Sequence, residues 1–255
     1  MKRLFKGLWM ALGMFTAIPL PFRIWDEKLM RQTIAALPLV GLIIGAIWWA
    51  GGLLLVSLAP PLVMAAAILT VLPFFAAGFI HLDGFMDTSD AMLSRRPFED
   101  GLRILRDPAV GTFAVVSLAV LFLLQFASVH TILSGQAYFA LFMAICAASR
   151  GCAAFSILAL RHMPGSNYAK MLGQNSDVSY KAFALVAVCA ALAASALYAG
   201  FVGLAATGAA VLGYAVAMRA AYKSFNGVSG DLLGYSIVIS ELCGLVALAL
   251  LGGAK

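Results

Sequence analysis

Three long intervals without a charged side chain dominate this sequence. Residues 32–82, 108–149 and 182–218 contain no Asp, Glu, Lys or Arg over 51, 42 and 37 consecutive positions. A helix that crosses a bilayer needs about 20 apolar residues, so each interval can hold two crossings, the third only just. Breaks are expected at Ala59-Pro60-Pro61, at Ser134-Gly135-Gln136 and near residues 200–203. With one more helix over residues 232–251, the sequence predicts an all-α, polytopic membrane helix bundle of about seven transmembrane helices.

The composition excludes the other common classes of protein. Hydrophobic residues make up 63% of the chain and charged residues 11%, against about 45–50% and about 25% in soluble domains, so lipid must cover the surface. The net charge of +6 comes from short, scattered basic groups instead of one basic tract, which disfavours a nucleic-acid partner. No second domain or internal repeat is evident. We therefore expect a single integral membrane domain over residues 1–255.

Basic residues recur on one side of the predicted bundle. With the N-terminus in the cytoplasm, nearly all Lys and Arg residues fall in cytoplasmic segments, and the three uncharged breaks fall outside. This is the distribution that membrane proteins show, so we expect the N-terminus and the chemistry to face the cytoplasm. Residues 1–31 are expected to be an uncleaved cytoplasmic or interfacial segment, because Lys2, Arg3 and Lys6 lie along a short amphipathic stretch.

The segment after the second predicted crossing has three carboxylates on one helical face. Asp83, Asp87 and Asp90 are spaced i, i+4 and i+7, within about 60° of one another on a helix. Carboxylates this close repel one another unless a cation neutralises them. Hard oxygen ligands favour Mg²⁺ or Mn²⁺, which bind through a few carboxylates and substrate phosphates. We predict an Asp-rich cytoplasmic catalytic segment over residues 81–111; alternatively, the acids only mark a helix start at the membrane interface.

Residues close to this segment in the sequence fit the same site. Arg95 and Arg96 follow the acids and are typical of an anion site. Asp107 is either a fourth metal ligand or a loop cap. His81 is either a donor to the site or an ordinary side chain at the membrane edge.

Two charged residues lie within predicted membrane helices. Arg150 and Glu241 would each be costly if they faced lipid, so each needs a partner. A substrate phosphate or the aspartates could neutralise Arg150, and a structural pair between Arg150 and Glu241 is the alternative. The Gly-rich turn at Gly227-Val228-Ser229-Gly230-Asp231 leads into a helix whose first N–H groups could hold a phosphate. The aromatic pairs Trp48-Trp49 and Phe74-Phe75 are expected to face lipid.

These residues alone indicate a membrane-embedded, metal-dependent enzyme that acts on a phosphate or diphosphate at the cytoplasmic face. Their order also resembles the cobalamin synthase family, the adenosylcobinamide-GDP ribazoletransferases of prokaryotic vitamin B12 assembly. The resemblance spans nearly the whole chain, and its most specific element is His81-Leu82-Asp83-Gly84 with Asp87 and Asp90. The other matching elements are Phe15-Thr16-Ala17-Ile18-Pro19-Leu20-Pro21, Arg106-Asp107 with Val110-Gly111-Thr112-Phe113, Ser149-Arg150-Gly151, Tyr168-Ala169-Lys170, and Gly230-Asp231-Leu232-Leu233-Gly234 with Glu241.

The resemblance implies a phosphoryl-type transfer in the prokaryotic cytoplasmic (inner) membrane. The substrates would be adenosylcobinamide-GDP and α-ribazole or its 5′-phosphate, and GMP would leave. Chemistry of this kind needs positioning and charge neutralisation by Mg²⁺ or Mn²⁺. We assign Asp83 and Asp87 to the metal, Asp90 to the metal or to general-base catalysis, and Asp107 to the metal or to its support. The remaining site residues are assigned to phosphates or to orienting the nucleotide: Arg95, Arg96, Arg106, Arg150, Lys170, Asp231, Glu241 and His81.

The sequence departs from the family pattern at Ala17, Pro108, Ala109, Lys170 and Val238, and three of these changes remove or alter a basic position. They bear on substrate affinity or nucleotide preference more than on the type of reaction. Two rival functions remain. A CDP-alcohol phosphotransferase would also have clustered aspartates, but its Asp-Gly-x-x-Ala-Arg element and later aspartate pair are missing. A cation-coupled transporter could use Arg150 and Glu241, although the chain has no repeated halves. A homo-oligomer is compatible with the sequence.

Overall fold

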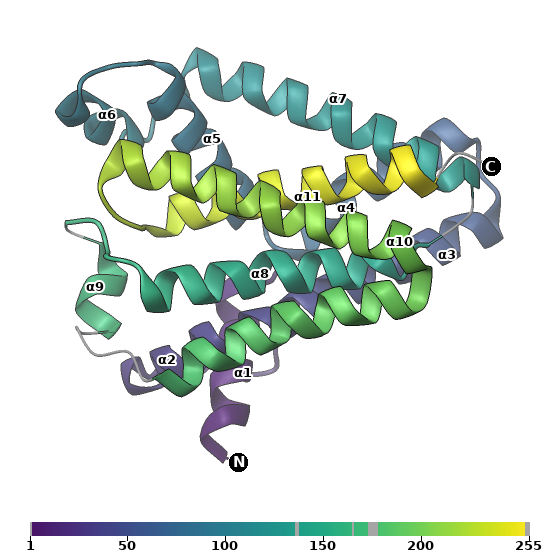
Figure 1. Cartoon of the computed structure of the whole chain (residues 1–255). Coiled ribbons are helices and arrows are strands. Elements are labelled where there is room, and N and C mark those ends of the chain that lie inside the picture. The colour runs from purple at the N-terminus through teal and green to yellow at the C-terminus, as the bar shows by residue number, and fades with distance from the viewer. Residues whose placement is uncertain (1, 136–137, 165, 173–177, 253–255) are drawn as a thin grey trace.

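The computed structural model describes residues 2–135, 138–164, 166–172 and 178–252, except for the side chains of residues 2, 167, 169 and 170. The described part is a bundle of helices (Figure 1) with one isolated β-bridge, between His162 and Val228. The helices are α1 (Lys2–Phe15), the 3-10 helix η1 (Glu27–Leu29), α2 (Met30–Ala35), α3 (Leu37–Leu58), α4 (Leu62–Ala76), α5 (Ile80–Leu93), α6 (Phe98–Leu105), α7 (Thr112–Gly135), α8 (Leu141–Ala159), α9 (Asn167–Leu172), α10 (Val178–Phe225) and α11 (Gly230–Gly252).

Helix length and composition confirm a polytopic membrane bundle. Within the described residues, five helices are long and apolar enough to cross a membrane: α3, α7, α8, α10 and α11. The bent pair α4 and α5 is a sixth candidate. The 48-residue α10 doubles back on itself (Figure 1), so its two arms count separately. Together with α3, α7, α8, α11 and the bent pair, the two arms of α10 give seven segments, as predicted.

The fold-back in α10 lies where the sequence predicts a break. Ala199 and Gly200 leave helical geometry, and Gly200 has a φ of +57° that favours glycine. The arms then approach so closely that a Cβ on Gly203 would lie 2.0 Å from the carbonyl oxygen of Ser195. The hydroxyls of Ser195 and Thr207 are 2.7 Å apart between the arms. Small residues and buried hydroxyls therefore hold this hairpin closed.

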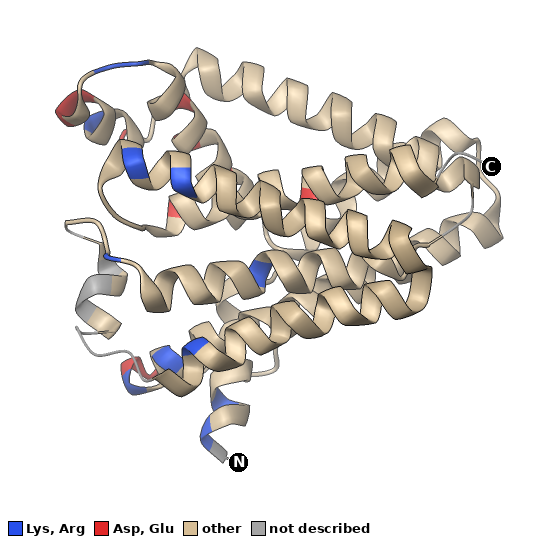
Figure 2. Ribbon diagram, viewed as in Figure 1, with Lys and Arg blue, Asp and Glu red and all other residues tan. Residues whose placement is uncertain are grey.

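The second predicted crossing is shorter than expected. Helix α4 ends at Ala76, and α5 continues at an angle of 93° to it. Pro73 near the end of α4, and positive φ values at Gly78 (65°) and Phe79 (61°), account for the break. Because of this bend, α5 runs in its own direction, with its acidic residues at the charged end of the bundle (Figure 2).

Helix α8 packs against α3, both arms of α10, and α11. Glycines on α3 allow very close contact: a Cβ on Gly41 would meet the Cys146 carbonyl oxygen at 2.2 Å. The expectation that Trp48 faces lipid is wrong. Its side chain is fully buried, stacks on Phe142, and donates a hydrogen bond to the Leu69 carbonyl oxygen at 2.8 Å. The expectation is also wrong for Phe74, which is buried, whereas Phe75 on the same helix is exposed as expected.

Candidate active site

The acidic face of α5 lies beside the first turn of α11. The two helices cross through glycines, since a Cβ on Gly84 would lie 2.7 Å from the Asp231 carbonyl oxygen. A Cβ on Gly234 would lie 3.0 Å from the His81 carbonyl oxygen. This close crossing brings Asp231 next to Asp83 and Asp87, although they are about 150 residues apart in the sequence.

The carboxylates on these two helices share one electrostatic environment. Partial burial, together with the charges of Asp83, Asp231 and Asp90, raises the pKa of Asp87 to about 6. Asp87 lies in the second half of α5, beyond the bend that separates this helix from α4. Burial is the largest cause of the raised pKa and the neighbouring carboxylates add to it, so a bound cation would oppose the rise.

The Asp90 carboxylate connects two helices. Its Oδ1 accepts a hydrogen bond from the Ala114 N–H at 3.3 Å, at the start of α7. A Cβ on Gly111 would lie 2.0 Å from Asp90 Oδ2, so a side chain at this position would displace the carboxylate. Asp90 thus joins the end of α5 to the beginning of α7, and its metal or general-base role stays a prediction.

Asp107 occupies the loop-cap position. Its Oδ1 accepts a hydrogen bond from the Ala109 N–H at 2.9 Å, which forms an Asx turn. Its exposed neighbour Arg106 donates to the Pro164 carbonyl oxygen at 3.1 Å. Of the two roles left open for Asp107, the structure supports the loop cap.

Two adjoining cavities meet at Tyr168, Gly230 and Asp231. The first, which we call the inner cavity, has a volume of about 150 Å³ and is also lined by His81 and Asp83. The second, the outer cavity, has a volume of about 270 Å³. Its polar wall comes from Arg106, Ser166 and Ser229 together with the three shared residues. The pair of cavities thus connects the acidic face to a basic residue and a helix N-terminus.

Tyr168 and His81 supply neutral polar groups to these cavities. Burial and the nearby Asp231 charge raise the pKa of Tyr168 to about 12, so its phenol remains a hydrogen-bond donor at neutral pH. His81 is 7% exposed, and its Nδ1 has no hydrogen-bond partner within the described part of the chain. An unsatisfied buried nitrogen beside a cavity suits a polar ligand.

Comparison with known proteins now decides the family. A family model described as cobalamin-5-phosphate synthase matches residues 7–249. The chain belongs to the cobalamin-5-phosphate synthase family. The predicted resemblance is confirmed along almost the entire sequence.

The family's relatives match at full length. A protein of Clostridium botulinum (strain Alaska E43) named adenosylcobinamide-GDP ribazoletransferase is 34% identical over 252 residues, which are 98% of this chain and 99% of the relative. A protein of the same name from Clostridium perfringens (strain ATCC 13124) is 33% identical, over 98% of this chain and 100% of its own. A protein of the same name from Geobacillus kaustophilus is 35% identical over 92% of this chain and 91% of its own length. No solved structure matches the chain.

The oxygen ligands fit a divalent cation of the kind predicted for a cobalamin-5-phosphate synthase. Asp83, Asp87 and Asp231 offer only carboxylate oxygens, and Asp83 and Asp231 line the inner cavity, where a substrate has space. In the residues the structure describes, no three His, Cys, Asp or Glu side chains converge closely enough to hold a metal by themselves. Mg²⁺ commonly binds through one or two carboxylates and completes its shell with water and substrate phosphates, so two of these acids suffice.

The intramembrane charges pair with each other. Arg150 is 1% exposed, and its guanidinium forms an ion pair with Glu241. The Ser149 hydroxyl donates to the same Glu241 oxygen at 2.9 Å. Neither charged residue lines the inner or the outer cavity. The structural alternative therefore accounts for Arg150 and Glu241 better than a contact with substrate phosphate.

The other basic positions divide into three groups. Arg95 and Arg96 are exposed on the link between α5 and α6, outside the walls of both cavities, and form no ion pair within the described residues. Arg106 lines the outer cavity. The side chain of Lys170 lies outside the described residues.

Among the family departures, Ala17 abuts Gly78 at the bend and Val238 is buried against α5.

Sequence reasoning assigned no role to Tyr168. It belongs to the family element Tyr168-Ala169-Lys170, in which the charge of Lys170 makes that residue the more evident candidate. Burial between two cavities and next to Asp231 could be learned only from the fold.

Proposed function

We propose that the protein is an adenosylcobinamide-GDP ribazoletransferase. It would transfer the adenosylcobinamide-phosphate group from the GDP-activated substrate to α-ribazole or α-ribazole 5′-phosphate, with release of GMP. The observation that supports this most is the meeting of the acidic face of α5 with Asp231 and Tyr168 at the two cavities. The family match supplies the type of reaction.

In the proposed reaction, the acceptor hydroxyl attacks the phosphorus on the cobinamide side of the diphosphate. A P–O bond forms there, the P–O bond to GMP breaks, and the hydroxyl proton passes to a carboxylate. Asp231 suits this last task because it lies where the two cavities meet. Asp90 is left to position α5 and α7.

Asp83 and Asp87 would hold Mg²⁺, or Mn²⁺ in its place. When bound, the cation would neutralise the diphosphate and the charge that develops on the leaving group. Arg106 and the first N–H groups of α11 would bind phosphate oxygens in the outer cavity. Tyr168 would donate a hydrogen bond to the acceptor or to a phosphate oxygen.

We further propose that the charged end of the bundle faces the cytoplasm. Lys and Arg gather at this end (Figure 2), which agrees with the usual distribution of basic residues. Both substrates could then reach the cavities from water, while the helices remain in the inner membrane.

Turnover by the purified protein tests the proposal. The full-length protein in liposomes is given adenosylcobinamide-GDP and α-ribazole, with Mg²⁺ or with EDTA, and GMP and the corrin product are measured. We expect GMP release and a cobalamin product only with the divalent cation. Equal turnover in EDTA would refute the metal assignment, and turnover of CDP-alcohol donors instead would refute the substrate assignment.

A further inference from the structure

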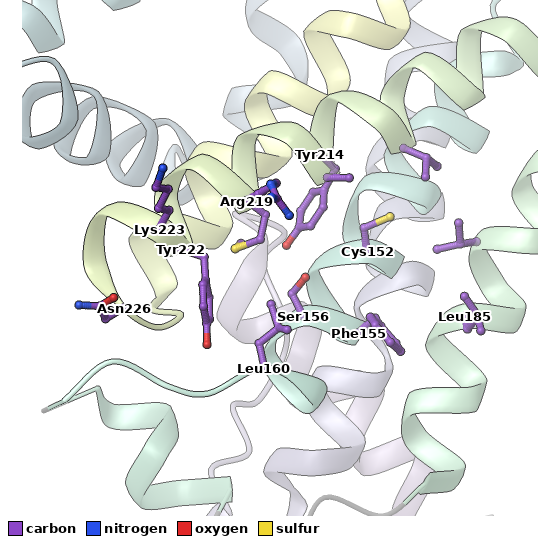
Figure 3. A pocket seen from close by; sticks show the side chains of 14 residues that line it. Cys152, Phe155, Ser156, Leu160, Leu185, Tyr214, Arg219, Tyr222, Lys223 and Asn226 are labelled. Carbon is purple, nitrogen blue, oxygen red and sulfur yellow. The ribbon is translucent and has the colours of Figure 1, made fainter.

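We propose that the groove between α8 and the two arms of α10 binds an anionic glycerophospholipid. This groove, which we call the α8–α10 groove, has a volume of about 670 Å³ (Figure 3). It shares no lining residue with the inner or outer cavity. The proposed catalytic reaction therefore leaves it without a function.

The body of the groove is apolar and open to the surroundings of the bundle. Phe155 from α8 and Leu185 from the first arm of α10 line it, with exposed fractions of 38% and 52%. The Tyr214 hydroxyl points toward Ser156 (Figure 3) but has no hydrogen-bond partner within the described residues, so it is an unsatisfied polar group in the wall of the groove. A hydrocarbon chain is the chemistry that fits such a surface.

The length of the groove corresponds to one leaflet. Its lining residues on the second arm of α10 run from Val211 to Lys223. Twelve helical steps of about 1.5 Å give a length of about 18 Å. Half of the roughly 30 Å hydrocarbon core of a bilayer is about 15 Å. An acyl chain that begins at the headgroup region would thus fill the groove to its end.

The groove is lined by two cations, and both lie near the end of α10, where a lipid headgroup would sit. Arg219 and Lys223 lie one turn apart at one end of the groove, and Cys152 lies toward the other (Figure 3). Both cations are exposed, and neither has an ion-pair partner within the described residues. Asn226 at the same end adds an amide donor. An anionic phosphodiester above an acyl chain matches this arrangement in charge and position.

Native mass spectrometry of the full-length protein tests the lipid site. The protein is purified in a neutral detergent and titrated with phosphatidylglycerol or with zwitterionic phosphatidylethanolamine, and the bound lipid is counted. We expect phosphatidylglycerol to bind more tightly. The double variant Arg219→Gln/Lys223→Gln should bind it about 30-fold more weakly, equivalent to about 2 kcal/mol for two basic residues. Lys28→Gln, an exposed cation outside the groove, should leave binding unchanged.

A second pair of variants tests the apolar part without changing charge. Ala215 lines the groove, whereas the adjacent Val216 is 69% exposed and does not. Ala215→Phe should fill the groove and reduce retained phosphatidylglycerol, while Val216→Phe should not. Equal binding of both lipids, or wild-type binding by the charge variant, would overturn the proposal. Displacement of the lipid by GMP or inorganic phosphate would assign the cations to a soluble ligand, and loss of a protein dimer in Ala215→Phe would assign the groove to a second copy of the chain.

Discussion

The substitution Gly84→Ala should separate the two helices that bring the acids together. A Cβ there would lie 2.7 Å from the Asp231 carbonyl oxygen and 2.8 Å from its Cα. Ordinary contacts of this kind begin at 3.4 Å, so α5 and α11 must move apart by about 0.7 Å. Overpacking of this size costs about 1–3 kcal/mol in the free energy of unfolding. Because a misplacement of about 1 Å can reduce a rate 10²-fold, we expect GMP release to fall roughly 10- to 100-fold.

The assay compares GMP release and thermal unfolding for the wild type, Gly84→Ala and a matched control. Gly208 lies in the second arm of α10, and a Cβ there would meet nothing within 4 Å. Gly208→Ala should therefore keep full activity, and its greater helix propensity should stabilise the protein slightly. Wild-type activity in a folded Gly84→Ala variant would refute the reasoning that this crossing sets the geometry of the site.

Three further predictions concern single groups. Without a cation, the raised pKa of Asp87 means that the folded state holds a proton that the unfolded state releases near pH 4. The unfolding temperature in EDTA should therefore fall as pH rises from 4 to 6. Mg²⁺ or Asp87→Asn should make the unfolding temperature less dependent on pH. Glu241→Gln should lower the free energy of unfolding by about 3–5 kcal/mol because it leaves Arg150 buried without its counter-charge. The double variant Glu241→Leu/Arg150→Met should recover much of that loss in thermal unfolding. A pair that served to bind substrate would not explain such a recovery. Tyr168→Phe removes one buried donor and should reduce kcat about 10- to 100-fold with unchanged unfolding; an unchanged kcat would remove Tyr168 from the site.

Much of the architecture follows from the sequence because lipid imposes simple rules. The charge-free intervals, and the breaks at Ala59-Pro60-Pro61 and near Gly200, predicted where helices start and fold back. The bend after Ala76 was not anticipated. It depends on backbone conformations at Gly78 and Phe79 that a hydropathy pattern does not encode.

The candidate site could be predicted only in part. The spacing of Asp83 and Asp87 showed that they share a face, and the Gly-rich turn drew attention to Asp231. Residue type alone could not show that Asp90 would accept a hydrogen bond at the start of α7.

Charged residues inside the membrane segments were harder to assign from the sequence. Arg150 and Glu241 each required a partner, but only the packing of α8 on α11 shows that they satisfy each other. The same is true of Trp48, whose burial depends on the contact of α3 with α4 and α8.

The most direct test of the central claim is the rate of GMP release by Asp83→Asn in the presence of Mg²⁺. The control is Asp100→Asn, which removes a carboxylate of the same end that forms an exposed ion pair with Arg103 at 3.3 Å. If the acidic face of α5 holds the catalytic cation, Asp83→Asn should lose GMP release almost completely while expression and helix content match the wild type, and Asp100→Asn should retain it. Near-wild-type turnover by folded Asp83→Asn would contradict the account.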